Sequence, residues 1–540
     1  MGKSKTSALS FAPLLLLFLL PLLLSLLLIL PGFADVGAFK TFFAHPQFFG
    51  GLKLTLFTGL ASTAVSLVFA ILITASLLKN RSTEAGAFLA LPHLAFAIGF
   101  GFLIAPAGLL SRFIGVAFTG ATSPPAWVTT QDPYGLALTA ALVLKETPFL
   151  VWAISAVLQR DDMQRGLRAQ LAVAQALGHG FASAWLRVVL PQVLPLVRWP
   201  LVAVLAYGLT VVDMALVIGP TQPPTLAQVI WTDLIDADAA MNARGAAGVL
   251  TLSFVILLLL WVVGLLLRLG SPYTRKFNSS TSPSLNIPIA ELAQIWGLWR
   301  LSYAAVGLML VLQSISGLWP FPNLLAEHFT AKAWQTGVEN PAPILTSLII
   351  ALVASALGLA ANVAWLEWQP TSRDRVMLAA ALFTLCLPSL VLGLGEYRLL
   401  LQLGLTGTAM GLFMVHVVPA VAYQFILLYG PYRGFDGRWR SAAQGLGTPP
   451  WRTLTIIKWP LLKAPLLAAF AVGFAVAIAQ YVPAQLAAAG RYSTLPIEAV
   501  TLTTGSNRAL LAAYALLLMA MPLCVFVTAS RLGRSRWMVA

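Results

Sequence analysis

Hydrophobic residues in this chain fall in long unbroken blocks, and not in the one-sided stripes of soluble helices. About twenty consecutive apolar residues span the hydrocarbon core of a bilayer as a helix. Twelve such blocks occur, six in each half of the 540 residues, and they predict an all-α membrane protein with about twelve transmembrane helices. The predicted spans are 9–31, 51–78, 87–110, 134–158, 197–219, 246–269, 301–319, 343–366, 377–395, 408–429, 466–489 and 509–530.

One polar stretch occurs twice, between the fourth and fifth block of each half. Its first copy is Ala172–Gly178 (AVAQALG), nine further residues, and Val188–Pro191 (VVLP). Its second copy is Ser441–Gly447 (SAAQGLG), nine further residues, and Ile457–Pro460 (IKWP). Five residues of the first copy recur unchanged 269 positions later, and a repeat of half the chain length predicts two copies of one domain.

The blocks and the repeat together predict the domain organisation. Residues 1–269 form a first domain, the polar and turn-rich segment 270–300 a linker, and residues 301–540 a second domain. Since each domain has an even number of spans, the two six-helix repeats enter the membrane in parallel. The repeated stretches lie in segments 159–196 and 430–465, here named the first and second repeat loop.

Composition and charge support the membrane assignment. With 59 % hydrophobic and 9 % charged residues, the chain has too little polar surface to cover a soluble globule. The net charge of +15 is scattered singly through short loops, which the positive-inside rule explains better than a nucleic-acid partner does. If the N-terminus with Lys3 and Lys5 is cytoplasmic, 23 of the 33 Lys and Arg residues in total are cytoplasmic, so both termini are predicted to face the cytoplasm.

The second repeat loop has the pattern of two short helices joined at a glycine. Apolar positions predict a helix over Arg438–Leu446, and Gly447 supplies the left-handed conformation that ends it. Thr448 and Pro449 are predicted to start a second helix that runs to Pro460, with Thr448 as N-cap. The pattern alone fits both a docking element for a partner protein and an ordinary amphipathic connector.

This stretch resembles the signature loop of ABC-importer permeases, and two copies in one chain resemble the fused permeases of the ferric-iron and thiamine importers. The resemblance covers nearly the whole chain, with further echoes at His416–Pro419 and Thr494–Ile497. The glutamate that opens the family's loop is replaced by Ala172 and Ser441. This departure bears on the detailed contacts with the ATPase more than on the assignment.

The resemblance implies a permease subunit in a bacterial inner membrane that forms the translocation path for thiamine or ferric iron. Its partners would be ABC ATPase subunits, expected in two copies, and an extracytoplasmic substrate-binding protein. Residues 179–187 and 448–456 would be the coupling helices. The implied contact residues are Ala174, Gly178, His179, Leu190 and Pro191 in the first loop, and Ala443, Gly447, Thr448, Ile457 and Pro460 in the second.

ATP chemistry is not expected on this chain. The sequence contains no Gly-x-x-x-x-Gly-Lys-Ser/Thr phosphate loop. An importer of this type would therefore bind ATP and Mg²⁺ on separate partner subunits, and this chain would be a transporter subunit without enzymatic activity or a bound cofactor. The five histidines are dispersed, and no cluster has metal-ligand spacing.

Ionisable residues inside predicted spans need a reason, because each costs roughly 2.5 to 3.5 kcal/mol at a helix centre. Lys145, Glu146, Asp213 and His416 are candidates for the translocation path, and buried ion pairs that pin helices together are the alternative.

Two other groups of polar residues are interpreted structurally. For Asn362 and Gln480 we predict interhelical hydrogen bonds. The acids Asp233, Asp236 and Asp238 are interpreted as a solvated loop in preference to a site for a cation or a binding protein.

Two other function classes remain open at this point. An ion-gradient-driven secondary transporter would use Lys145, Glu146 and Asp213 as coupling groups. A structural membrane protein would use the repeat loops only to hold a partner. The matched spacing of the two loops favours the importer, because a gradient-driven carrier has no need of two docking loops.

Overall fold

The computed structural model describes residues 13–77, 85–159, 161–279 and 289–533. Lys3 and Lys5, which set the predicted orientation, lie outside these ranges. Regular structure in the described ranges is helical, apart from two isolated bridges. Helix α15 (Ala239–Ser279) extends into the predicted linker from one side and α16 (Ile289–Ser314) from the other.

The number of membrane-crossing helices is slightly lower than the sequence predicted. Within the described ranges nine helices are long and apolar enough to cross a membrane, or up to 11 if each of two bent pairs is one span. The remaining predicted span, 87–110, which is the third along the chain, consists of the short helices α5 (Ala85–Leu89) and α6 (His93–Ile104). The 12 residues of α6 rise about 18 Å, which is less than the thickness of the hydrocarbon core.

The predicted span 377–395 is not one continuous helix. The chain there forms α19 (Thr371–Cys386) and α20 (Ser389–Leu403), which meet at an angle of 110°. Pro388 explains the break, because proline lacks an N–H and pushes the residue before it into an extended conformation. Leu387 is indeed extended, with φ −78° and ψ 126°.

The chain divides into two compact units. The first-half unit comprises Gly32–Leu89 and Phe96–Phe329, and the second-half unit comprises Met1–Pro31, Ala90–Ala95 and Thr330–Ala540. Apart from the repeat loops, the principal helices of the first-half unit are α3 (Val36–Phe43), α4 (Phe48–Leu77), α8 (Leu136–Leu158), α12 (Arg198–Thr210), α14 (Leu226–Leu234), α15 and α16. Those of the second-half unit are α2 (Leu20–Ile29), α17 (Lys332–Glu339), α18 (Ala342–Trp368), α19, α20, α21 (Ala409–Arg433), α25 (Lys463–Ile478), α27 (Leu495–Thr503) and α28 (Arg508–Gly533).

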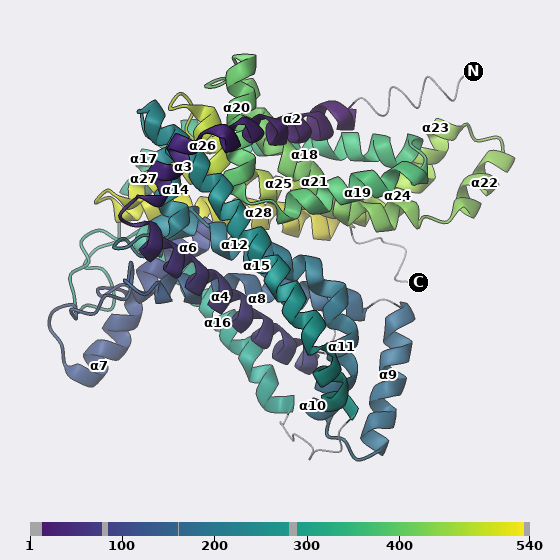
Figure 1. Ribbon diagram of the computed structural model, residues 1–540, viewed down its shortest axis with the longest axis horizontal. Helices are drawn as coiled ribbons and strands as arrows, with labels where there is room; N and C mark the ends of the chain where they lie inside the picture. Colours follow the sequence, from purple (N-terminus) through teal and green to yellow (C-terminus); the bar gives the residue numbers. More distant parts are fainter. Residues whose placement is uncertain (1–12, 78–84, 160, 280–288, 534–540) are drawn as a thin grey trace. The chain divides into compact units, whose positions relative to one another are not determined.

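The first spans of the two halves are exchanged between the units. Helix α2, from the start of the chain, packs along α20 of the second-half unit (Figure 1). Helix α16, which opens the second half of the sequence, packs on α4 of the first-half unit. The predicted domains 1–269 and 301–540 describe the sequence repeat and stay a prediction. The two packing units divide the chain at other positions.

Close backbone packing holds α2 in place. A Cβ at Gly395 of α20 would lie 2.5 Å from the carbonyl oxygen of Ser25 on α2. Arg398, one turn later, donates a hydrogen bond to the Leu28 carbonyl at 3.0 Å, near the end of α2. Gly99 of α6 instead faces side chains of the exchanged helix α16, since an added Cβ there would lie 2.7 Å from a methyl carbon of Val306.

Replacing Gly395 by alanine is expected to destabilise the protein by about 1–3 kcal/mol, because the added methyl overpacks against backbone that cannot turn aside. The matched control is Gly430→Ala in α21, where an added Cβ meets nothing within 4 Å. That change should be neutral or stabilise by up to about 1 kcal/mol through helix propensity. Thermal unfolding of the detergent-purified protein measures both, and equal melting temperatures would contradict the packing argument.

A buried amide network connects the helices of the second-half unit. Asn362 of α18 donates to the Val421 carbonyl of α21 at 3.1 Å, and Gln424 of α21 donates to the Ser355 carbonyl of α18 at 2.9 Å. The predicted interhelical role of Asn362 is confirmed. For Gln480 the prediction is wrong, since its amide donates to a carbonyl one turn earlier along the chain.

Candidate functional site

The first repeat loop turns sharply at a left-handed glycine. Helix α9 (Asp161–Ala176) is followed by Gly178, whose φ is +87°. The Gly178 N–H donates to the Gln175 carbonyl at 3.0 Å, and the His179 N–H donates to the Ala174 carbonyl at 3.1 Å. This pair of bonds is the Schellman motif, which satisfies carbonyls at a helix end and favours glycine because other residues are strained there.

The second repeat loop has the same turn at the matched positions. Helix α22 (Gly437–Gly445) is followed by Gly447 with φ +80°. Gly447 donates to the Gln444 carbonyl at 3.0 Å, and Thr448 donates to the Ala443 carbonyl at 3.1 Å. The predicted left-handed glycine is confirmed, and the two loops share one backbone design.

A short helical segment follows each glycine. In the first loop it comprises α10 (Phe181–Ala184), η4 (Trp185–Val189) and α11 (Leu190–Val193), and in the second α23 (Pro450–Thr453), η6 (Leu454–Lys458) and α24 (Trp459–Leu461). The predicted N-cap is wrong by one residue, because Pro449 is the N-cap and Pro450 the first helical residue. Pro449 precedes a proline and is therefore held extended, with φ −66° and ψ 151°.

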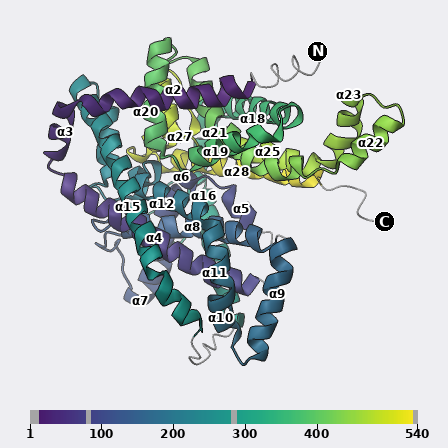
Figure 2. The same cartoon turned by 45° about the vertical axis from the view of Figure 1, so that its right-hand side comes forward.

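The two loops also expose the same side chains. Ala174 and Ala443 are buried, whereas Leu177 is 75 % exposed and Leu446 is 88 % exposed. Among the other predicted contact residues, Pro191 and Pro460 are exposed, and His179, Leu190, Thr448 and Ile457 are half-buried. Helices α22 and α23 lie at the end of the second-half unit, beyond α18 and α21 (Figure 2). Each loop therefore presents one protruding leucine directly before its glycine.

The fifth span of each half is interrupted at a matched position. In the first half α12 ends at Thr210 and α13 (Asp213–Ile218) begins three residues later. In the second half α25 ends at Ile478 and α26 (Val482–Ala488) begins 269 positions after Asp213. Non-helical backbone at membrane depth is tolerated where it is buried in protein or lines a cavity.

Asp213 and the Lys145–Glu146 pair lie in the first-half unit. Asp213 is half-buried and accepts a hydrogen bond from the Tyr207 hydroxyl at 3.4 Å. Lys145 and Glu146 are buried in α8, and the Lys145 ammonium donates to the Phe88 carbonyl at 3.2 Å. Glu146 and Asp213 also take part in further polar interactions.

Helix α16 donates hydrogen bonds to a carbonyl of α8 that has no helical N–H partner because of a proline. Pro148 lies inside α8 and cannot donate to the carbonyl of Leu144, four residues earlier. The Trp299 indole and the Tyr303 hydroxyl of α16 both donate to this carbonyl, each at 3.2 Å. The carbonyl left without its helical partner by Pro148 therefore accepts hydrogen bonds from the exchanged helix α16, and it belongs to the residue before Lys145.

The comparisons with known proteins agree with this architecture. No family model matches the chain. Over 518 residues, 94 % of this chain and 92 % of the relative, the sequence is 29 % identical to the inner membrane ABC transporter permease protein YnjC of Escherichia coli (strain K12). The chain is a permease subunit of an ABC transporter.

A second relative covers a smaller part. Over 178 residues the permease is 26 % identical to the thiamine transport system permease protein ThiP of Haemophilus influenzae, which is 32 % of this chain and 33 % of that protein. The permease is a multi-pass protein of the inner membrane, and membership of the family implies ATPase partners, since the permease subunit is not itself the ATPase.

His416 belongs to the second-half unit, apart from the three other candidates of the first-half unit. It is 3 % exposed in α21, and its Nδ1 lies 2.6 Å from the Leu412 carbonyl of the same helix. Lys145, Glu146 and Asp213 thus belong to one unit of the permease, and His416 belongs to the other.

Three buried acids of the second-half unit escaped the sequence analysis. Glu396 of α20 is 3 % exposed, and neither carboxylate oxygen has a hydrogen-bond partner among the described residues. Glu367 and Asp374 are buried in ion pairs at the ends of α18 and α19. Glu367 and Glu396 directly follow the predicted spans 343–366 and 377–395, so a search for ionisable residues inside the spans misses both. A test of whether apolar residues resume after the acid would have found Glu396.

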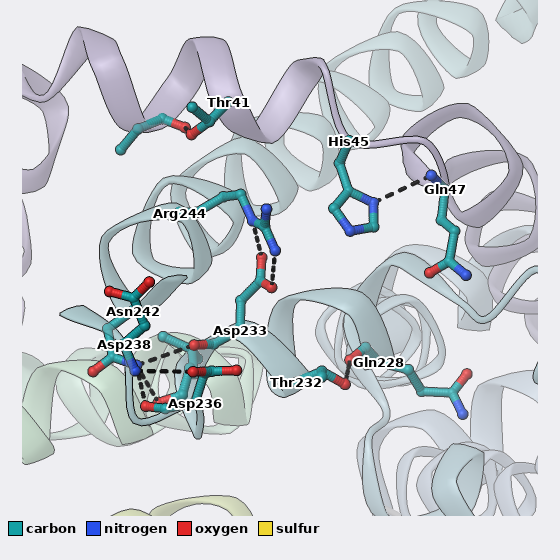
Figure 3. A network of polar contacts seen from close by, with 12 residues as sticks. Thr41, His45, Gln47, Gln228, Thr232, Asp233, Asp236, Asp238, Asn242 and Arg244 are labelled. Carbon is teal, nitrogen blue, oxygen red and sulfur yellow. Dashed lines mark hydrogen bonds and ion pairs between the residues drawn. The ribbon is translucent and has the colours of Figure 1, made fainter. Parts of the chain in front are cut away.

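The acidic group between α14 and α15 is only partly a solvated loop. Figure 3 shows Arg244 of α15 facing Asp233 of α14, with hydrogen bonds of 2.8 and 2.6 Å to its two carboxylate oxygens. Asp233 is buried, so the prediction is wrong for this residue, which fastens α14 to α15. Asp236 and Asp238 are exposed, as predicted, and accept hydrogen bonds from backbone N–H groups of the turn.

Proposed function

We propose that the permease is the fused pore subunit of an importer and that its two repeat loops bind ATPase subunits in the cytoplasm. One observation carries this proposal: both loops combine the same Schellman turn with a protruding leucine, at positions 269 residues apart. Large exposed apolar side chains that repeat at matched positions indicate a binding surface. Two such surfaces fit two ATPase subunits, one on each loop.

The loops supply the contact surface without the glutamate that opens the family's loop. Leu177 and Leu446 protrude, whereas Ala174 and Ala443, three residues earlier, are buried within the permease. An apolar knob that enters a pocket is a typical interface anchor. Arg and Lys residues of both loops support their cytoplasmic orientation, and with it the cytoplasmic placement of both termini.

The translocation path is proposed to pass the interrupted fifth spans. Asp213 directly follows the interruption in the first half, and Lys145, Glu146 and His416 are the other ionisable residues proposed to flank the path. Carboxylates in such a path favour a cationic substrate. Together with the similarity to a thiamine permease over a third of the chain, this makes thiamine the first substrate to test, with ferric iron second.

An extracytoplasmic binding protein would deliver the substrate. The two alternative classes lose their basis, because an ABC permease draws its energy from ATPase subunits. An ion gradient is then not needed, and a purely structural role leaves the interrupted spans unexplained.

Cross-linking tests the docking surface directly. The chain has two cysteines, so replacing Cys386 and Cys524 by serine gives a background for Leu177→Cys or Leu446→Cys. A bifunctional thiol–amine reagent should join either cysteine to an ATPase subunit in membranes that contain the whole transporter. The control is Leu401→Cys, an exposed site on α20 outside both loops. Equal yields from all three cysteines, or no ATPase product from the loop positions, would refute the proposal.

A further inference from the structure

A cluster of buried charges lies beneath the second repeat loop, centred on Glu367 at the end of α18. The Glu367 side chain is 5 % exposed. One of its carboxylate oxygens accepts a hydrogen bond from the guanidinium of Arg440 in α22. The other accepts from the Lys458 ammonium at 2.6 Å and from the Tyr432 hydroxyl of α21 at 3.0 Å. A single carboxylate thus joins both segments of the loop to two helices of the membrane domain.

The surrounding groups fix this geometry. The Lys458 ammonium, on a side chain that is 9 % exposed, lies 4.0 Å from the centre of the Tyr432 ring. The Trp459 indole donates to the Tyr432 hydroxyl at 3.2 Å. A second pair stands beside the first, in which Arg433 donates to Asp374 of α19 at 2.7 and 2.9 Å. Buried ion pairs need this many partners, because desolvated charges are costly unless each is satisfied.

The first repeat loop has no such charges at the matched positions. Subtracting 269 from Arg440 and Lys458 gives Leu171 and Val189. Val189 is 0 % exposed, so the same place in the fold is buried in both copies but is apolar in one and charged in the other. Apolar contacts are non-directional and let packed surfaces slide, whereas a buried charge cluster holds one geometry.

We propose that Glu367 is a positioning residue that locks the second repeat loop to α18 and α21, so that this loop and these helices move as one body. The first repeat loop has apolar residues at both matched positions, cannot form the same lock, and is the more adaptable of the two docking elements. The inference deepens the proposed function and rests on it, because the lock matters to transport only if an ATPase subunit pushes on the loop. The two loops therefore have similar backbone shapes but differ in how rigidly each is attached to the membrane helices.

The residues of the first repeat loop define the variant that tests this proposal. The triple change Glu367→Leu, Arg440→Leu and Lys458→Val gives the second loop the apolar residues of the first at both matched positions. It removes the carboxylate together with both cations, and exchange of whole buried ion clusters for apolar residues is often tolerated. The single change Glu367→Leu would instead leave two cations unpaired and destabilise the protein, so it cannot separate positioning from folding.

Spin labels measure the lock without a substrate. Cysteines at Leu446 in the loop and Leu357 on α18, both exposed, carry the labels in the cysteine-free background, and the full chain is studied in nanodiscs. The labelled protein that keeps Glu367, Arg440 and Lys458 should show one narrow peak in the distribution of distances between the two labels. The folded triple variant should lose this peak, and ATP hydrolysis by its complex with the ATPase subunits should fall at least about fivefold, the lower range of coupling effects.

Retention of both the narrow peak and the hydrolysis rate in the folded triple variant overturns the inference. If the triple variant does not fold, Glu367→Asp takes its place, since it keeps the charge but is one methylene too short to hold both cations. A narrow peak in that variant likewise overturns the inference. Failure of Leu446→Cys to cross-link to an ATPase subunit would refute the proposed function alone, because the label distances are measured on the permease by itself.

Discussion

Replacing Gly447 by aspartate is expected to abolish binding of an ATPase subunit to the second repeat loop while the permease stays folded and inserted. A Cβ added at Gly447 meets nothing within 4 Å, so the new side chain projects into the space where the partner would lie. Asp is among the residues that tolerate the left-handed conformation best, which keeps the cost to folding small. The change therefore acts on the interface and not on the fold.

The expected loss corresponds to an interface hot spot of about 2 kcal/mol or more, which is roughly thirtyfold weaker binding. Co-purification and binding of the ATPase subunit to nanodisc-embedded permease measure it, and Gly178→Asp should have a similar effect on the first loop.

Gly404→Asp is the matched control. Gly404 also has a positive φ, of +65°, and open space around an added Cβ, but it follows α20 outside both loops. If Gly404→Asp weakens binding as much as Gly447→Asp, the effect is one of folding and the docking surface is misplaced.

The second large effect is expected at Asp213. We expect Asp213→Asn to lower uptake of a cationic substrate at least about tenfold, because opposite unit charges about 4 Å apart interact by about 4 kcal/mol at an effective dielectric constant of about 20. The substitution keeps the shape of the side chain and its ability to accept a hydrogen bond from Tyr207. Folding and ATPase binding should therefore be unchanged.

Uptake of radiolabelled thiamine, and of ferric iron as the second probe, into cells that carry the whole transporter measures the effect. Asp238→Asn removes an exposed acid of the same unit and should leave uptake unchanged. Unchanged uptake of every transported probe in Asp213→Asn would remove Asp213 from the path and leave it as a packing residue.

Local patterns predicted the repeat loops well because their structure is local. The Schellman turns at Gly178 and Gly447 depend on residues within six positions of one another, and the sequence contains both the glycine and the helix before it. The helix after Gly447 begins one residue later than predicted, because Pro450 holds Pro449 in an extended conformation. Such errors come from competing local preferences.

Charged residues near span ends could not be interpreted in the same way. Asp233 and Glu367 look alike in the sequence, as acids beside apolar runs, yet neither is solvated. Asp233 pairs with a residue 11 positions away, and Glu367 with residues 73 and 91 positions away. Whether an acid is solvated or paired is decided by which helices meet, and no periodicity contains that information.

The sequence by itself determined the fold class, the duplication and the glycine-centred turns of both loops, because bilayer thickness, repeat length and backbone sterics act on neighbouring residues. Only the tertiary structure decided that the first spans are exchanged, that α19 and α20 form a bent pair of 110°, and that a buried carboxylate holds Lys458 where the first repeat loop has the buried Val189. These features arise from packing between segments far apart in the chain, where each contact depends on the positions of several helices at once.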